Sequence, residues 1–162
     1  MSDLHALIYV STAVRQPTQA DLDRLISRAR VRNLEQGVTG LLLYAHGNFM
    51  QYLEGGEAGM ATVYAAIKAD PLHSGIVELL REPIQERVFE EWAMGFRSIS
   101  AFGVANPVQL DRVFRARVDP ELCQPKAAHT LLWNFWNKGS VGAAVVAGAS
   151  AASRGTPVQA RT

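Results

Sequence analysis

Three polar residues of this chain have side chains that could hydrogen-bond a ligand or one another: Tyr9, Asn33 and Gln51. Gln51 lies in the stretch FMQYLEG, residues 49–55, which otherwise alternates like a half-buried strand. An unpaired buried amide costs roughly 1–3 kcal/mol, so a buried Gln51 needs a hydrogen-bonding partner in the protein or in a ligand. The glutamine amide has a donor end and an acceptor end, and either end can meet that need.

Each of these residues also has a purely structural interpretation. Gln51 could lie at a sheet edge or face solvent, Tyr9 could be an ordinary core tyrosine, and Asn33 could cap the end of a helix. Only the three together indicate a binding site, so the elements that carry them decide between the interpretations.

The predicted elements follow the order β-α-β-β-α-β-β. They span residues 4–12, 19–34, 38–55 as two strands, 59–70, 75–84 and 92–99. Thr18 is a candidate N-cap with Asp21 three residues later, and Gly37 suits the end of the first helix. The His-Gly-Asn run within AHGN suits a tight turn between the two strands of the hairpin.

This order predicts an α+β fold, a ferredoxin-like sandwich (βαββαββ) with two helices on one face of a mixed sheet. Strands one and three are neighbours in such a sheet, which would bring Tyr9 and Gln51 together. An additional C-terminal helical pair is expected over residues 107–118 and 125–139. The second of these helices has an apolar face, and we expect it to cover the open face of the sheet with Leu132, Phe135 and Trp136.

Length and composition predict one sheet-and-helix domain over residues 1–100, a helical extension packed on the sheet over 101–138 and a flexible low-complexity tail over 139–162. The net charge of +1 argues against direct binding of nucleic acid or of an anionic membrane surface. Cys123 is the single cysteine, and the N-terminus lacks the features of a secretory signal, so a cytoplasmic protein is expected. The apolar run in the tail is too short to span a membrane.

Five segments in order resemble the BLUF family of flavin-binding blue-light sensor domains: LIYVS, RNLEQGVTGLLLY, GNFMQYLEG, DPLHSGIVEL and FEEWAMGF. The resemblance covers about residues 4–98 and is closest to the short, single-domain type. It implies a ferredoxin-like fold with an oxidised flavin, usually FAD but with FMN or riboflavin possible, held non-covalently between the two sheet-packed helices with its ring over the sheet.

The resemblance also implies roles for single residues. Tyr9 matches the photoactive tyrosine, Gln51 the glutamine whose hydrogen bonds switch, by rotation or by tautomerisation, and Asn33 the asparagine that binds the flavin ring edge. A phenol can supply an electron and a proton together, and an amide can bridge Tyr9 and the flavin in two hydrogen-bond patterns.

Four further residues stand at flavin-binding or signalling positions of the family. Trp92 and Met94 match a signal-relay pair and, being two apart on a predicted strand, would share a face, where core packing explains them equally well. His73 matches a histidine near the ribityl or phosphate side but could be a solvated loop residue. Arg32 stands where many relatives carry a histidine or an asparagine, and its guanidinium could pair with the flavin or point to water. Ala29 replaces a hydroxyl residue that often lies one turn before Asn33, which removes one possible hydrogen bond.

Two other classes of function remain as alternatives. Acylphosphatases share the topology and use one arginine and one asparagine, roles that Arg15 and Asn33 would have to take, but STAVRQPTQ has no glycine to expose a phosphate-binding backbone. A cofactor-free interaction module would leave Gln51 facing solvent. Residues 100–137 are too few for a cyclase or phosphodiesterase, so the chain is not expected to be an enzyme or to hold a metal. Its output is expected to be light-dependent association with an unidentified downstream protein or with other copies of itself.

Overall fold

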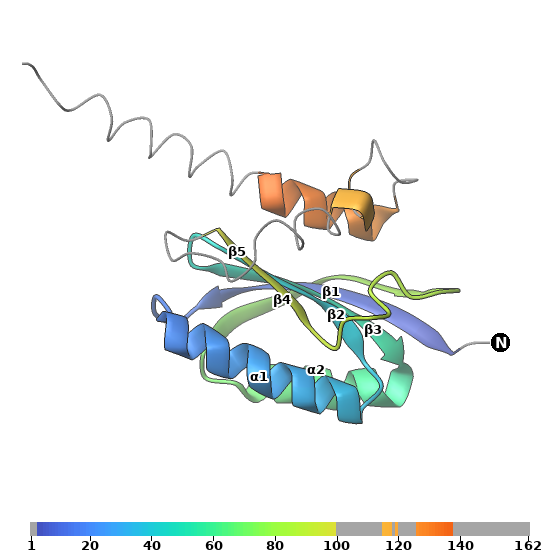
Figure 1. The fold of residues 1–162 in the computed structure, drawn as a ribbon, viewed down its shortest axis with the longest axis horizontal. Coiled ribbons are helices and arrows are strands. Elements are labelled where there is room, and N and C mark those ends of the chain that lie inside the picture. The colour runs from blue at the N-terminus through green and yellow to red at the C-terminus, as the bar shows by residue number, and fades with distance from the viewer. Residues whose placement is uncertain (1–2, 100–114, 118, 120–125, 138–162) are drawn as a thin grey trace, which may run out of the picture.

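The structure of the chain is a computed structural model that describes residues 3–99, 115–117, 119 and 126–137 (Figure 1). Most of the helix predicted over 107–118, the cysteine at position 123 and the tail predicted over 139–162 lie outside the described residues. The division into a domain, an extension and a tail therefore stays a prediction. Within the described part, no helix is both long and apolar enough to cross a membrane.

The described strands form one five-stranded sheet in the order β4-β1-β3-β2-β5. Their bounds are β1 Leu4–Ala13, β2 Thr39–Ala45, β3 Asn48–Gly56, β4 His73–Pro83 and β5 Gly95–Ile99. Strand β5 runs parallel to β2 while the other neighbours are antiparallel, so the sheet is mixed. The predicted α+β, ferredoxin-like fold is confirmed.

Helices α1, Gln19–Glu35, and α2, Glu57–Ala69, lie on one face of the sheet (Figure 1). The predicted cap of α1 is confirmed: the Thr18 side chain accepts from the Asp21 amide, and the Asp21 carboxylate accepts from the Thr18 amide. α1 and α2 approach each other closely at one end, where a Cβ on Gly59 would lie 2.2 Å from the main-chain oxygen of Gln36.

The hairpin between β2 and β3 turns at His46 and Gly47, whose φ angles of 49° and 81° are both left-handed. A two-residue turn with two positive φ angles matches the twist of the strands, as the AHGN run predicts. The strand predicted over 92–99 is shorter than expected, because β5 begins only at Gly95. Trp92 and Met94 therefore precede the strand.

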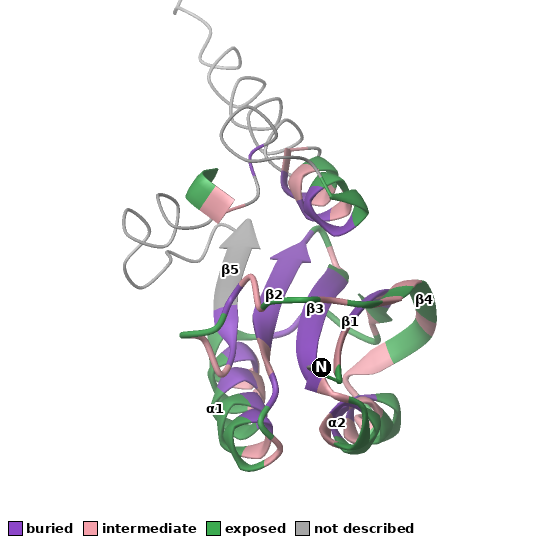
Figure 2. Cartoon of the chain, turned by 90° about the vertical axis from the view of Figure 1, so that its right-hand side faces the viewer, coloured by how far each residue is buried: buried purple, intermediate pink, exposed green. Residues whose placement is uncertain are grey.

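Apolar side chains fill both faces of the sheet, and strands β2 and β3 are almost wholly buried (Figure 2). We call the packing between the sheet and α1 and α2 the helix-side core: Leu7, Tyr9, Leu22, Ile26, Ala29, Val38, Leu42, Tyr44, Phe49, Leu53, Met60, Val63, Ile67 and Met94. The far-side core covers the opposite face: Ala6, Ile8, Leu41, Leu43, Met50, Tyr52, Phe89, Ala128, Leu132 and Trp136.

Residues 127–137 form the helix that completes the far-side core (Figure 1). Leu132 and Trp136 are buried in that core, and Phe135 is partly buried against it. The three residues expected to cover the open face of the sheet do so.

Candidate functional site

Tyr9 and Gln51 are directly opposite each other on the neighbouring strands β1 and β3. Both side chains are buried, and the Tyr9 hydroxyl donates a hydrogen bond to Oε1 of Gln51. The register explains the contact: Tyr9 and its neighbours at odd positions of β1 point into the helix-side core. Gln51 thus has a partner within the protein, and the solvent-facing interpretation is wrong.

The two ends of the Gln51 amide contact different partners. Desolvation is the main cause that raises the pKa of Tyr9 far above its usual value, against the opposing effect of the Arg32 charge. The phenol therefore stays protonated, and its O–H donates to the amide oxygen of Gln51. The amide nitrogen points the other way and donates to Sδ of Met94 at 3.3 Å.

Met94 is buried in the helix-side core, and α1 holds its main chain. Nε of Arg30 donates to the carbonyl oxygen of Met94 at 3.1 Å, and Nδ2 of Asn33 donates to that of Ala93 at 2.8 Å. The segment in front of β5 is therefore tied to the helix by two side chains. The Met94 sulfur is placed beside Gln51.

Trp92 does not share a face with Met94, so that expectation is wrong. The Trp92 ring packs against the far-side core and stacks on Phe89 with 5.4 Å between ring centroids. Alternation by two applies to extended strands, whereas both residues precede β5 and the chain bends between them. Gly95 makes room for this bend, because a Cβ there would lie 2.5 Å from the Trp92 ring.

Two buried polar atoms on α1 have no hydrogen-bond partner among the described residues: Oδ1 of Asn33 and Nε of Arg32. Asn33 is completely buried, and its amide nitrogen binds Ala93 rather than the end of the helix, which rules out the capping interpretation. Desolvation lowers the pKa of Arg32. An acceptor and a donor thus lie at neighbouring positions of α1 without partners among the described residues, and buried polar atoms of this kind call for a partner.

His73 is the first residue of β4 and not a solvated loop residue. Its Nδ1 shares a hydrogen bond of 2.8 Å with Oγ of Ser11, and its ring lies 4.7 Å from that of Phe49 and 6.3 Å from that of Tyr9, between centroids. Desolvation lowers the pKa of the imidazole, so the ring is neutral at physiological pH.

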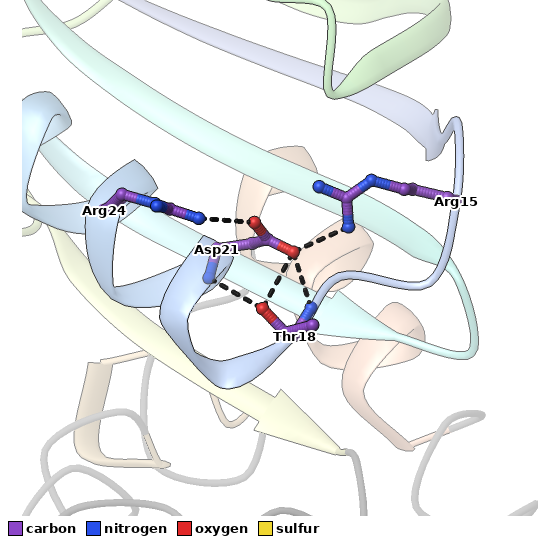
Figure 3. A network of polar contacts seen from close by, with 4 residues as sticks. All are labelled: Arg15, Thr18, Asp21 and Arg24. Atoms are coloured by element: carbon purple, nitrogen blue, oxygen red, sulfur yellow. Dashed lines mark hydrogen bonds and ion pairs between the residues drawn. The ribbon is translucent and has the colours of Figure 1, made fainter.

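A cavity of about 430 Å³ lies beside the first half of α1. Its lining consists of Val14, Arg15, Asp21, Arg24, Leu25, Arg28, Asp70, Pro71 and Leu72. Arg15 and Arg24 both bond to the Asp21 carboxylate, at 2.7 and 2.9 Å (Figure 3). The Arg15 bond is the main cause that lowers the pKa of Asp21. Arg28 forms no ion pair with the described residues, which leaves the cavity with an available cation.

Three residues with polar contacts around these segments were not predicted from the sequence: Ser11, Arg30 and Glu54. Glu54 had a detectable signal, because it is a polar residue in the buried interior of β3, as Gln51 is. The roles of Ser11 and Arg30 depend on long-range contacts with His73 and with the Met94 main chain, for which the sequence carries no local signal.

A family model described as "BLUF: Sensors of blue-light using FAD" matches residues 4–95. Among curated proteins, the photoactivated adenylate cyclase subunit beta of Euglena longa is 36% identical over 109 residues, which are 67% of this chain and 13% of that protein. The blue light- and temperature-regulated antirepressor BluF of Escherichia coli (strain K12) is 37% identical over 91 residues, 56% of this chain and 23% of the antirepressor. The chain thus spans a minor part of these relatives.

Solved structures similar to this chain include one that is described as a BLUF protein. The dark-state structure of BlrB, described as a BLUF protein, has a TM-score of 0.59 at 33% identity, with 75% of this chain and 83% of that chain covered. Klebsiella pneumoniae BlrP1 with FMN and cyclic diGMP has a TM-score of 0.66 at 31% identity, with 82% of this chain and 34% of that chain covered.

Proposed function

We propose that this chain, which belongs to the BLUF family of blue-light sensors that use FAD, binds its flavin between α1 and the sheet and responds to light through Tyr9 and Gln51. The observation that carries the proposal is the buried hydrogen bond between these two residues, with the unpartnered atoms of Arg32 and Asn33 on the helix that covers them. The cofactor-free alternative gives no reason for those two atoms to be buried.

The polar groups present fit a flavin. The edge of the flavin ring carries carbonyl oxygens and an imide N–H, so it can donate to Oδ1 of Asn33 and accept from the guanidinium of Arg32. Ala29, one turn before Asn33, is buried in the helix-side core and offers no hydroxyl. Asn33 and Arg32 are therefore the residues that we assign to the ring edge, with Tyr9, Gln51, Met94 and His73 around the ring.

Tyr9 is suited to release an electron and a proton together. The flavin supplies absorption of blue light and an excited state that is a strong oxidant. The phenol of Tyr9 is held protonated by its burial, and its proton already lies in the hydrogen bond to Gln51. The proton can therefore move to the carbonyl oxygen of Gln51 without any rearrangement of side chains.

After absorption of light, the hydrogen bonds of Gln51 change, by rotation of its amide or by tautomerisation. In the described arrangement its nitrogen faces Sδ of Met94, which can only accept. A rotated amide would place its oxygen against that sulfur, and two acceptors in contact repel each other. Met94 therefore favours the present orientation, and a changed Gln51 displaces Met94. Each hydrogen-bond arrangement of the Gln51 amide, before and after light, can last in a buried site, because hydrogen bonds are strong there.

Among flavins, we propose FAD, with FMN also accepted, over riboflavin. Arg24, Arg28 and Arg32 are spaced one turn apart and form a row along α1. The row runs from Arg32, which we assign to the flavin ring edge, to the cavity lined by Arg24 and Arg28. Arginine binds phosphate well. A phosphate-bearing tail that extends along this row would reach the basic cavity, whereas riboflavin has no phosphate to place there.

The output that we propose is association with a downstream protein or with further copies of the chain, in the cytoplasm, and not catalysis. An acylphosphatase would need Arg15 and Asn33 together, but Arg15 bonds Asp21 in the first turn of α1. At 1.5 Å per residue, Asn33 lies roughly 18 Å further along the helix. The helix of residues 127–137, on the far-side core that Trp92 contacts, is the surface that we expect to change.

The test is a light-minus-dark absorption spectrum of the purified protein after supplementation with FAD. We expect a yellow protein whose flavin band shifts to longer wavelength under blue light and returns in the dark. A colourless protein after supplementation under native conditions contradicts the proposal, as does a bound flavin whose spectrum does not change with light.

A further inference from the structure

The carboxylate of Glu54 is completely buried on the far side of the sheet and accepts four hydrogen bonds. Its Oε1 accepts from Oγ1 of Thr39 at 3.1 Å and from the Phe89 amide at 2.6 Å. Its Oε2 accepts from the Tyr52 hydroxyl at 3.0 Å and from the Val88 amide at 2.8 Å. Each carboxylate oxygen thus holds one main-chain amide of the segment that follows β4.

That segment, residues 84–94, connects β4 with β5, and we call it the strap. The strap starts on the far side of the sheet, where the Phe89 side chain is buried, and ends on the helix side with Met94. Arg87 adds a bond of 3.1 Å to the main-chain oxygen of Glu54, and the Gly40 amide donates to the Trp92 oxygen at 3.0 Å.

Strand β3 therefore contacts the strap from both of its faces. Gln51 faces the helix side and holds the end of the strap through the Met94 sulfur. Glu54, three residues later on the same strand, faces the far side and holds the middle of the strap through Val88 and Phe89. The hydrogen bonds to Glu54 fix the main chain at Val88 and Phe89, a few residues before Met94.

We propose that Glu54 is a positioning residue that sets Met94 against the Gln51 amide, so that it controls the orientation of that amide without touching it. The inference rests on the proposed function, because it concerns the light response of the same site. A carboxylate is required at this position, since an amide would present its own N–H to the amide of either Val88 or Phe89. With one of those buried amides unpaired, the strap loses part of its fixed register and Met94 shifts relative to Gln51, although Arg30 and Asn33 still bond to the main chain of residues 93 and 94.

The test is Glu54→Gln in the full chain, with NMR of ¹³C-labelled methionine methyl groups in the dark. The chain has four methionines, and Met94→Leu assigns the Met94 signal. We expect the Met94 methyl signal to shift or broaden while those of Met50 and Met60 stay as in the parent. A Met94 signal unchanged in position and width overturns the proposal.

The light response supplies the readout that a merely structural role would not change. In Glu54→Gln the flavin red shift should remain, because Tyr9 and Gln51 are intact. The lit state should last roughly three- to tenfold longer, because the returning Gln51 amide has lost its acceptor. A lifetime equal to that of the parent contradicts the inference. A parent without any red shift refutes the proposed function instead, and the dark methyl spectrum still decides the role of Glu54.

Tyr52→Phe is the matched control. It removes the hydrogen bond that the Tyr52 hydroxyl donates to Glu54 and leaves the Val88 and Phe89 amides bound. It should keep the parent's Met94 signal and lifetime. Should Glu54→Gln fail to fold, hydrogen exchange of the unaltered protein decides. The Val88 and Phe89 amides should exchange as slowly as amides of β3, and exchange at the rate of an exposed loop would overturn the anchor.

Discussion

Two buried polar clusters on opposite faces of the sheet differ in how completely their atoms are paired. On the far side, every oxygen of the Glu54 carboxylate has two donors. On the helix side, Asn33 and Arg32 each keep a buried atom without a partner among the described residues, although both lie on a well-formed helix. Buried polar groups are paired in stable proteins, so the Glu54 network is complete as it stands, whereas the Arg32 and Asn33 atoms need the partner that the proposed flavin would supply.

The largest expected effect concerns the helix side. Tyr9→Phe should retain flavin and lose the light-induced red shift completely, because phenylalanine has no ionisable proton and is not readily oxidised. Gln51→Leu should do the same. Tyr44→Phe, at another buried tyrosine of the helix-side core, is the control and should keep the shift. A reversible red shift in both Tyr9→Phe and Gln51→Leu would exclude this pair as the photochemical site.

A truncation on the far side should affect stability and not photochemistry. Leu132 is completely buried in the far-side core, so Leu132→Ala should lower the free energy of unfolding by about 2–4 kcal/mol. Urea denaturation measures this loss, and the spectrum of the folded variant should still shift with light. Unchanged stability would show that the helix of residues 127–137 does not pack on the sheet in solution.

Asn33→Ala should weaken flavin binding roughly tenfold or more, because the ring edge would lose a hydrogen-bonding partner in a buried site. Titration of the apoprotein with FAD, followed by flavin fluorescence, measures the affinity. Leu34→Ala is the control on the same helix, since Leu34 is 76% exposed. Equal affinities of the two variants would mean that Asn33 serves only to hold Ala93.

The smallest effect is a pH dependence from His73. Burial lowers the pKa of its imidazole below the ordinary 6.5, so the folded apoprotein binds fewer protons than the unfolded chain below that value. The stabilising contribution is complete above the ordinary pKa and is lost as the pH falls through the lowered one. His73→Gln should therefore lose less thermal stability than the parent between about pH 7.5 and about pH 5.5. The charges of Asp70 and Arg32 act in both proteins, and parallel curves would argue against the imidazole as the cause.

The sequence predicted the elements better than it predicted their junctions. The pairing of Tyr9 with Gln51 followed from strand order, and the cap at Thr18 followed from residue types at fixed spacing. The opposite faces of Trp92 and Met94 could not be foreseen, because strand periodicity does not hold where a chain bends. Within the site, residue types indicated Asn33 and Arg32, but only the three-dimensional arrangement reveals which of their atoms lack partners.

Gly59 sets how closely α2 approaches the end of α1. A side chain at this residue would collide with the main-chain oxygen of Gln36, which follows α1, so the two backbones are in contact there. The cavity lined by Arg24 and Leu72 lies beside the other half of α1. For a flavin bound along α1 as proposed, we expect entry from the Arg24 end, because the contact at Gly59 leaves no opening between the helices at the other end.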